Sequence, residues 1–173
     1  RLHRSVISDN TGGALSLNSL VGYRITNNLI LRNGDSNAGN TIYIYASDGL
    51  FAFNTLVQNQ AKPPAVGGLA ISGTGGKLTG NLFYANTTGS GTSPVYGYAP
   101  DSTNVIAPNL PQPDPIFVAP AQDDYRLMPD TPANRSCCQD RVPADTQQDL
   151  VIDYYGQPRA RGLRSDVGAA ELQ

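Results

Sequence analysis

Tryptophan is absent from this 173-residue sequence, and methionine, histidine and cysteine occur only once, once and twice. No long segment places apolar residues at i, i+3, i+4 and i+7, so amphipathic helices are not expected. No run of eighteen apolar residues occurs either, so the sequence predicts no membrane-spanning helix. Glycine (18) and proline (13) are frequent instead. This composition predicts an all-β domain.

An excess of one charge sign is also lacking, because 12 basic residues stand against 14 acidic ones. No cluster of lysine or arginine forms the surface that a phosphate backbone requires, so nucleic acid is not an expected partner. The length suits one domain. The sequence begins at Arg1 without a charged and then apolar leader, so we expect either that a signal was removed or that an upstream region precedes it.

The two cysteines, Cys137 and Cys138, are neighbours in the sequence. This arrangement is neither a metal-ligand spacing nor a disulfide framework, and no cofactor is expected. Neighbouring Cα atoms lie about 3.8 Å apart, closer than in most disulfides. Three alternatives stay open: a strained bond between the neighbours, two free thiols, or pairing with chain outside this sequence.

An internal repeat is the clearest pattern. Five segments align without gaps, and their last residues are separated by 23, 26, 27 and 23 positions: 5–10, 28–33, 54–59, 81–86 and 104–109. The third position of the segment is apolar in every copy: Ile7, Ile30, Leu56, Phe83 and Ile106. A second apolar column lies three residues ahead of the segment: Leu2, Ile25, Phe51 and Leu78. The period is typical of a three-sided solenoid.

A third strand follows each of the first three segments, with alternating apolar pairs at Leu15 and Leu17, Ile42 and Ile44, and Leu69 and Ile71. This alternation indicates strands with one buried face. We therefore predict a right-handed parallel β-helix over residues 1–110. We expect the segment 111–173, which is Pro-rich from Pro111 through Pro143, to close the end of the last coil and to pack on the same solenoid. Linkers of variable length precede the third strands, so a binding groove is expected at that corner.

Asparagine recurs at the first and last positions of the repeated segments. Coils of such a stack lie about 4.8 Å apart, so equivalent amides can hydrogen-bond along a column. Two structural ladders are therefore predicted, one of Asn28, Asn54 and Asn81 and one of Asn33, Asn59 and Asn86. The alternative is that these side chains form a binding site.

The C-terminal region carries a series of short motifs: Asp114-Pro115-Ile116-Phe117, Asp124-Tyr125-Arg126-Leu127, Thr131-Pro132-Ala133, and Asp166-Val167-Gly168-Ala169 followed by Glu171. With Asp153, Gly156 and Arg159, this region resembles the segment that follows the helix in secreted bacterial right-handed β-helix proteins of the choice-of-anchor type. The resemblance implies an extracellular or cell-surface location. Members of this family have varied or unknown activities, so it implies no particular reaction.

Four charged residues of this region are assigned a structural role. Asp153, Arg159, Asp166 and Glu171 are expected to form a charge-paired staple that ties the chain end to the last coil, because carboxylates match the fork of an arginine. A catalytic carboxylate pair is the alternative.

Catalytic groups are not evident, and we assign none. His3 is the only histidine and has no nucleophile motif around it. Asn33, Asp35 and Asn37 place oxygens at alternate positions of a turn and are weak calcium candidates. No metal site is predicted, because the glycine and the bidentate glutamate of a calcium loop are replaced by Ala38 and Ile44.

Tyrosines give the best indication of a ligand. Tyr43 and Tyr45 are expected to face outward beside the inward Ile42 and Ile44, and Tyr96 and Tyr98 are expected to do the same about two coils later. Exposed tyrosine rings on a flat face suit stacking against sugar rings. Ordinary strand tyrosines that cover the solenoid are the alternative. Arg32 completes the set of candidate carbohydrate-binding residues.

Two functions are consistent with the sequence. In the first, the chain is a non-catalytic end of a secreted or cell-surface β-helix, a rigid scaffold for adhesion or for contact with a polysaccharide or surface glycan. In the second, it is a fragment of a polysaccharide lyase or glycoside hydrolase whose catalytic coils lie upstream. Leu2 already occupies a core column, so upstream coils of the same protein are an expected partner in either case.

Overall fold

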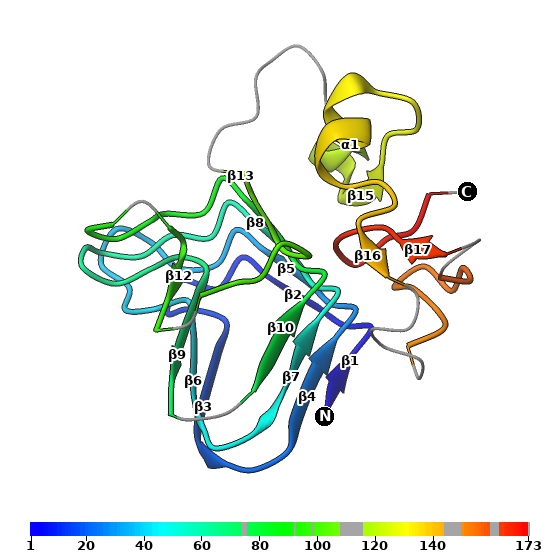
Figure 1. Ribbon diagram of the computed structural model, residues 1–173. Coiled ribbons are helices and arrows are strands. Elements are labelled where there is room, and N and C mark those ends of the chain that lie inside the picture. Colours follow the sequence, from blue (N-terminus) through cyan, green and yellow to red (C-terminus); the bar gives the residue numbers. More distant parts are fainter. Residues whose placement is uncertain are drawn as a thin grey trace.

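Stacked parallel strands dominate the computed structural model and form a β-solenoid of about four turns (Figure 1). The structure describes residues 1–73, 76–91, 93–97, 99–107, 116–143, 150–159 and 163–172. The predicted parallel β-helix is confirmed. The helical elements among the described residues are one short α-helix, α1 (Pro132–Cys137), and one 3-10 turn, η1 (Pro120–Gln122). None of these residues forms a helix long and apolar enough to cross a bilayer.

Each of the four coils contributes one strand to each of three parallel sheets, and β13 adds a fifth strand to the second sheet. The first sheet contains β1 (Leu2–His3), β4 (Tyr23–Thr26), β7 (Gly49–Ala52) and β10 (Lys77–Thr79). The second contains β2 (Val6–Ser8), β5 (Leu29–Leu31), β8 (Thr55–Val57), β11 (Leu82–Tyr84) and β13 (Val105–Ala107). The third contains β3 (Leu15–Leu20), β6 (Ile42–Ala46), β9 (Leu69–Ser72) and β12 (Val95–Tyr96).

The register of the sheets follows the sequence repeat. Ile7 pairs with Ile30, and the same column continues through Leu56, Phe83 and Ile106. The second column pairs in the same way through Leu2, Ile25, Phe51 and Leu78. Because equivalent positions lie directly above one another, the apolar column residues pack into one interior core.

Both predicted asparagine ladders are present. The backbone N–H and Nδ2 of Asn28 donate to Oδ1 of Asn54 at 3.0 and 2.9 Å, and Asn54 donates in the same way to Asn81. The second ladder runs from Asn33 through Asn59 to Asn86. Because these side chains are buried and each amide is satisfied, they fix the register of the coils.

A single residue with positive φ turns the chain ahead of each ladder. Arg4, Asn27, Phe53 and Gly80 form the first corner column, with φ between 49° and 64°. Asp9, Arg32, Gln58 and Ala85 form the second corner column. One left-handed residue turns the chain from one sheet to the next, and the following asparagine supplies hydrogen bonds that hold the strained corner.

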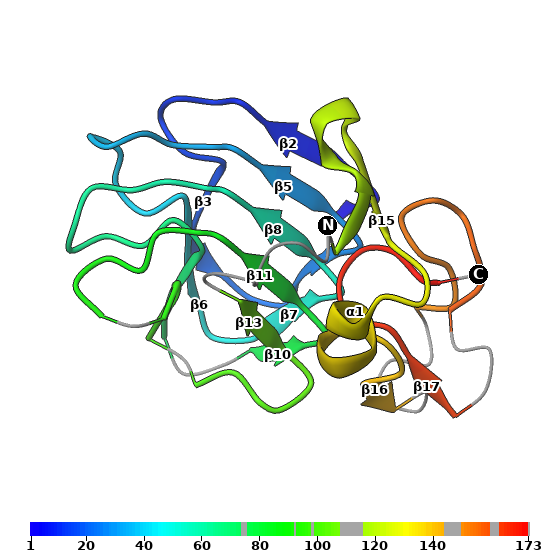
Figure 2. The ribbon, with the colours of Figure 1, turned by 90° about the horizontal axis from the view of Figure 1, so that it is seen from above.

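The C-terminal segment lies beside the stack of coils (Figure 2). It contains two antiparallel pairs, β14 (Phe117–Ala119) with β15 (Asp124–Leu127), and β16 (Val142–Pro143) with β17 (Arg164–Ser165). We expected this segment to close the end of the last coil. Its described residues pack against the side of the second, third and fourth coils.

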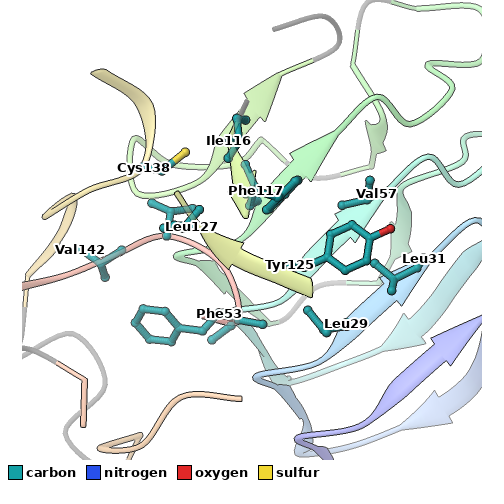
Figure 3. Packing of buried hydrophobic residues seen from close by; sticks show 14 of the residues in the cluster. Leu29, Leu31, Phe53, Val57, Ile116, Phe117, Tyr125, Leu127, Cys138 and Val142 are labelled. Carbon is teal, nitrogen blue, oxygen red and sulfur yellow. The ribbon is translucent and has the colours of Figure 1, made fainter. Parts of the chain in front are cut away.

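The outward positions of the second sheet explain this lateral packing. Leu29, Leu31, Val57 and Leu82 point away from the interior core, yet they are buried. They pack with residues of the C-terminal segment in a second, outer core (Figure 3) that includes Ile116, Phe117, Tyr125, Leu127 and Val142. Apolar residues on both faces of a strand require a cover on both faces.

Cys137 and Cys138 are joined by a disulfide, which selects the first of the three alternatives. Cys138 lies in the outer core at the end of α1, and its backbone carbonyl accepts a hydrogen bond from the N–H of Val167 at 2.8 Å. The side chain of Asn134, within the same helix, is buried and donates to the carbonyl of Ile116. The disulfide therefore belongs to the packing of the C-terminal segment.

Candidate functional site

The third sheet carries the tyrosines on its outward side. Strand alternation places Leu15, Ile42 and Leu69 in one inward column. The adjacent outward column contains Ser16, Tyr43, Ala70 and Tyr96, and the next outward column contains Asn18, Tyr45 and Ser72. Tyr43, Tyr45 and Tyr96 therefore share one face, which we call the tyrosine face. Tyr98 lies outside the described residues.

The three rings differ in how they are held. Tyr45 and Tyr96 are 48% and 69% exposed. Tyr43 is half-buried, and its Oη lies 2.9 Å from Oγ of Ser72 in the next coil. Ala70 lies between Tyr43 and Tyr96 in the outward column but is only 1% exposed, so its neighbours cover it. The face therefore combines one ring fixed by a hydrogen bond with two rings open to solvent.

A pocket of about 340 Å³ adjoins the tyrosine face at Tyr45. We call it the corner pocket, and its lining consists of Ser19, Leu20, Val21, Tyr45, Ala46, Ser47 and Gly73. It lies where the third strands end, whereas we expected a groove at the linkers before these strands. A register shift between Asn18 and Leu20 leaves Leu20 and Val21 exposed beside the ring. Their apolar side chains ahead of a glycine turn were the only sequence signal for this pocket.

Arg32 does not lie on the tyrosine face. It belongs to the second corner column, and its Nε and Nη2 donate to the two carboxylate oxygens of Asp9 at 2.8 and 2.9 Å. Nη1 lies 3.0 Å from Asp123 and donates to the hydroxyl of Tyr125 at 2.7 Å. The Asp9 hydrogen bond raises the pKa of Arg32, and the same bond lowers the pKa of Asp9. Arg32 thus binds the C-terminal segment to the coils through Asp123 and Tyr125.

The opposite charges of Asp9 and Arg32 were visible in the aligned repeat. They are consecutive members of one column, so their side chains meet on adjacent coils. The contacts to Asp123 and Tyr125 carried no such signal, because these residues lie outside the repeat.

The calcium candidates have other partners. Oδ1 of Asn33 accepts from the backbone N–H and Nδ2 of Asn10. Oδ1 of Asp35 accepts from the backbone N–H of Asn37 at 2.7 Å and closes a turn. Among the residues that the structure describes, no three or more His, Cys, Asp or Glu residues are grouped to hold a metal ion.

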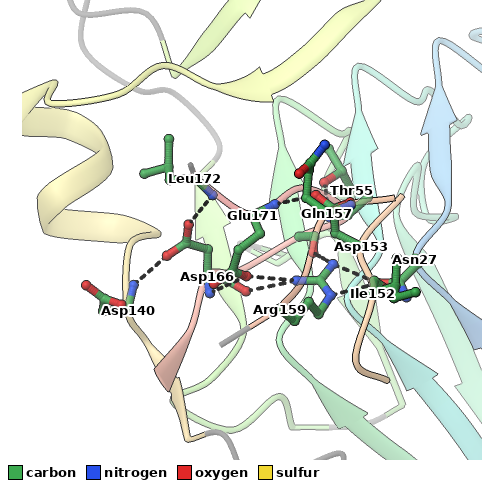
Figure 4. A network of polar contacts seen from close by, with 12 residues as sticks. Asn27, Thr55, Asp140, Ile152, Asp153, Gln157, Arg159, Asp166, Glu171 and Leu172 are labelled. Atoms are coloured by element: carbon green, nitrogen blue, oxygen red, sulfur yellow. Dashed lines mark hydrogen bonds and ion pairs between the residues drawn. The ribbon is translucent and has the colours of Figure 1, made fainter. Parts of the chain in front are cut away.

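The four charged residues of the C-terminal region come together in a buried cluster, the C-terminal clasp (Figure 4). Nη1 of Arg159 lies 3.4 Å from Oε2 of Glu171, and Nη2 donates to Oδ1 of Asn27 at 2.7 Å. The guanidinium also lies 4.2 Å from the centroid of the Phe53 ring. Burial lowers the pKa of Arg159 to about 10, and the nearby carboxylates oppose this shift, so it is protonated at neutral pH.

The two aspartates of the clasp bind backbone amides. Asp153 accepts from the N–H groups of Gln157 and Glu171, at 2.7 and 2.8 Å. Asp166 accepts from the N–H groups of Asp140 and Leu172, both at 2.7 Å. Burial raises the pKa of Asp166, and these two amides oppose the rise. The two aspartates therefore hold the backbone of the C-terminal segment in place around Arg159.

The clasp lies at a different place on the solenoid from the one we expected. We expected these residues to tie the chain end to the last coil. Asn27 and Phe53 belong instead to the second and third coils, and the N–H of Gly168 donates to the carbonyl of Gly80 in the fourth. The first corner column is therefore the line along which the C-terminal segment docks.

A further pocket of about 420 Å³ contains Asp123, Asp124, Asp153 and Glu171 among its lining residues. Asp123 contacts Arg32, and Asp153 and Glu171 belong to the clasp. Arg126 hydrogen-bonds Asp124 and lowers the pKa of its carboxyl group. Each of these carboxylates is thus held by a structural partner, whereas the rings of Tyr45 and Tyr96 are open to solvent.

Comparison with protein-family models, with curated proteins and with solved structures finds no match to this chain.

Proposed function

We propose that this chain is a rigid, non-catalytic part of a secreted or cell-surface β-helix protein, and that its tyrosine face binds carbohydrate. The observation that carries the proposal is the placement of Tyr43, Tyr45 and Tyr96 on the outward face of the third sheet, with Tyr45 bordering the corner pocket. A tyrosine ring offers an apolar surface to a sugar ring and a hydroxyl to its polar groups.

Polar side chains surround the rings. Ser16, Asn18 and Ser72 lie in the same outward columns, and Ser19 and Ser47 line the corner pocket. Hydroxyl and amide groups can both donate to and accept from sugar hydroxyls. The face therefore combines the two kinds of contact that a carbohydrate site needs.

The scaffold beneath this face supports the proposal as well. The asparagine ladders fix the register of the coils, and the Tyr43–Ser72 hydrogen bond orients one ring before any ligand arrives. A face that is already ordered loses little conformational entropy on binding. The secreted or surface location rests on the resemblance of the C-terminal motifs to the choice-of-anchor type.

A glycan array tests the proposal with the 173-residue chain and a variant carrying Tyr43→Ala and Tyr45→Ala. We expect the wild type to bind and the double variant to lose binding. Tyr154→Ala is the control, because this half-buried ring lies in the C-terminal segment and the hydrogen bonds of Tyr154 to Ala169 and Arg4 use its backbone. Equal binding by the wild type and the double variant contradicts the carbohydrate face. Turnover of a polysaccharide by the chain contradicts the non-catalytic assignment.

A further inference from the structure

Charge is missing from the tyrosine face. The described strands of the third sheet, β3, β6, β9 and β12, contain no acidic, basic or histidine residue. The residues that line the corner pocket are likewise uncharged. The whole chain carries 12 basic and 14 acidic residues, so this neutrality belongs to the face and not to the composition.

The first side of the solenoid differs in this respect, whereas the strands of the second side are also uncharged but are covered by the C-terminal segment. Arg24 and Lys77 lie in strands of the first sheet. The second sheet ends at the corner column that holds Asp9 and Arg32. The third side therefore combines uncharged strands with exposure to solvent, and it carries the exposed tyrosines.

A neutral aromatic face selects among glycans. The faces of aromatic rings are electron-rich, so a carboxylate placed against them is repelled. It would also lose hydration without gaining a cation or an ion pair. A neutral sugar meets neither penalty, because its C–H surface packs on the rings and its hydroxyls bond to serine, asparagine and tyrosine groups.

We propose that the tyrosine face and the corner pocket bind neutral glycans and discriminate against glycans built from uronic acids. This inference rests on the proposed carbohydrate-binding function and adds the class of sugar. Tyr45 is the residue on which it depends most, because this ring belongs to both the face and the pocket. Leu20 and Val21, 37% and 78% exposed, extend the uncharged surface beyond the ring.

Affinity electrophoresis in native gels that contain a soluble polysaccharide tests the inference. The neutral probes are galactomannan, xyloglucan and dextran, and the acidic probes are polygalacturonate and alginate. We expect at least one neutral polymer to retard the wild type, and Tyr45→Ala to weaken this retardation about tenfold or more. Tyr154→Ala is expected to migrate as the wild type does, and circular dichroism checks that each variant is folded.

The outcomes separate the two proposals. Retardation by a uronic-acid polymer that Tyr45→Ala abolishes overturns the neutral-glycan inference and leaves carbohydrate binding in place. Another outcome is retardation by an acidic polymer that added salt removes and that Tyr45→Ala leaves unchanged. Such retardation reports charge attraction elsewhere on the chain. Together with Tyr45-dependent binding of a neutral polymer, this result supports the inference. The absence of any Tyr45-dependent retardation overturns both proposals.

Discussion

The guanidinium of Arg159 lies over the ring of Phe53, 4.2 Å from its centroid. Phe53 is a corner residue of the third coil, whereas Arg159 belongs to the C-terminal segment. The arginine side chain is 2% exposed and that of its partner Glu171 is 4% exposed. A buried cation thus joins the segment to the solenoid, and its charge is balanced by the only glutamate of the chain.

Removing the cation should destabilise the protein strongly. Arg159→Met removes the buried cation of the Arg159–Glu171 ion pair, which is expected to lower the free energy of unfolding by about 3–5 kcal/mol. Urea unfolding followed by circular dichroism measures the change. Arg126→Met is the matched control, because the Arg126–Asp124 pair is exposed and its loss should cost about 1 kcal/mol or less. Similar losses in the two variants contradict the role given to the clasp.

The asparagine ladders make a second prediction about stability. Asn54→Ala removes the acceptor of two buried donors, the backbone N–H and Nδ2 of Asn28. Each unsatisfied donor costs about 1–3 kcal/mol. The free energy of unfolding should therefore fall several times more in Asn54→Ala than in a variant with an exposed asparagine replaced. Asn18→Ala on the outward side of β3 supplies that comparison. If both variants unfold at the same urea concentration, the ladder does not stabilise the fold.

Gly80 tests the docking of the C-terminal segment along the first corner column. A Cβ at Gly80 would lie 2.8 Å from the Phe53 ring and 3.2 Å from Cγ2 of Val142, at φ +64°. Gly22 has a similar φ of +68° but nothing within 4 Å. Gly22→Ala therefore measures the cost of the left-handed backbone alone, and we expect it to lower the free energy of unfolding by about 1–2 kcal/mol.

We expect Gly80→Ala to be the more damaging of the two substitutions, because it adds a steric clash to the same backbone strain. Limited proteolysis should then cleave the C-terminal segment faster in Gly80→Ala than in Gly22→Ala. Equal cleavage rates would show that the segment does not depend on contact at this corner.

Alkaline pH should loosen the same segment. Burial raises the pKa of Tyr155 to about 12 from 10.0, and its hydroxyl accepts a hydrogen bond from the N–H of Tyr125. The folded state therefore holds this proton more tightly than the unfolded state does. The resulting stability is fully present below pH 10 and is lost as the pH rises toward 12.

Urea unfolding measured below pH 10 and near pH 12 tests whether stability falls over this interval. The wild type is compared with Tyr155→Phe. The wild type should lose more stability over the interval than the variant, which has no phenol to ionise at this position. A variant that loses as much as the wild type would assign the alkaline effect to other groups.

Much of the fold could be predicted because the same pattern of apolar and polar positions recurs in each coil. The column of Ile7 is apolar in five copies, so its inward direction was evident without coordinates. Tyr43 and Tyr45 followed from the same alternation, since the two neighbours of the inward Ile44 must both point outward. The part of the candidate site that lies on a regular strand was therefore predictable. The corner pocket was not, because it depends on a register shift near Leu20.

The sequence by itself determined the coils, their register and the asparagine ladders, because these contacts join residues one repeat apart and recur along the chain. Only the tertiary structure decided where the C-terminal segment lies, what Arg32 and Arg159 contact, and that the two cysteines are bonded. Arg32 and Tyr125 are 93 residues apart, and Arg159 and Asn27 are 132 apart. Such contacts occur once and have no period, so they are set by which apolar outward surfaces remain to be covered after the coils have formed.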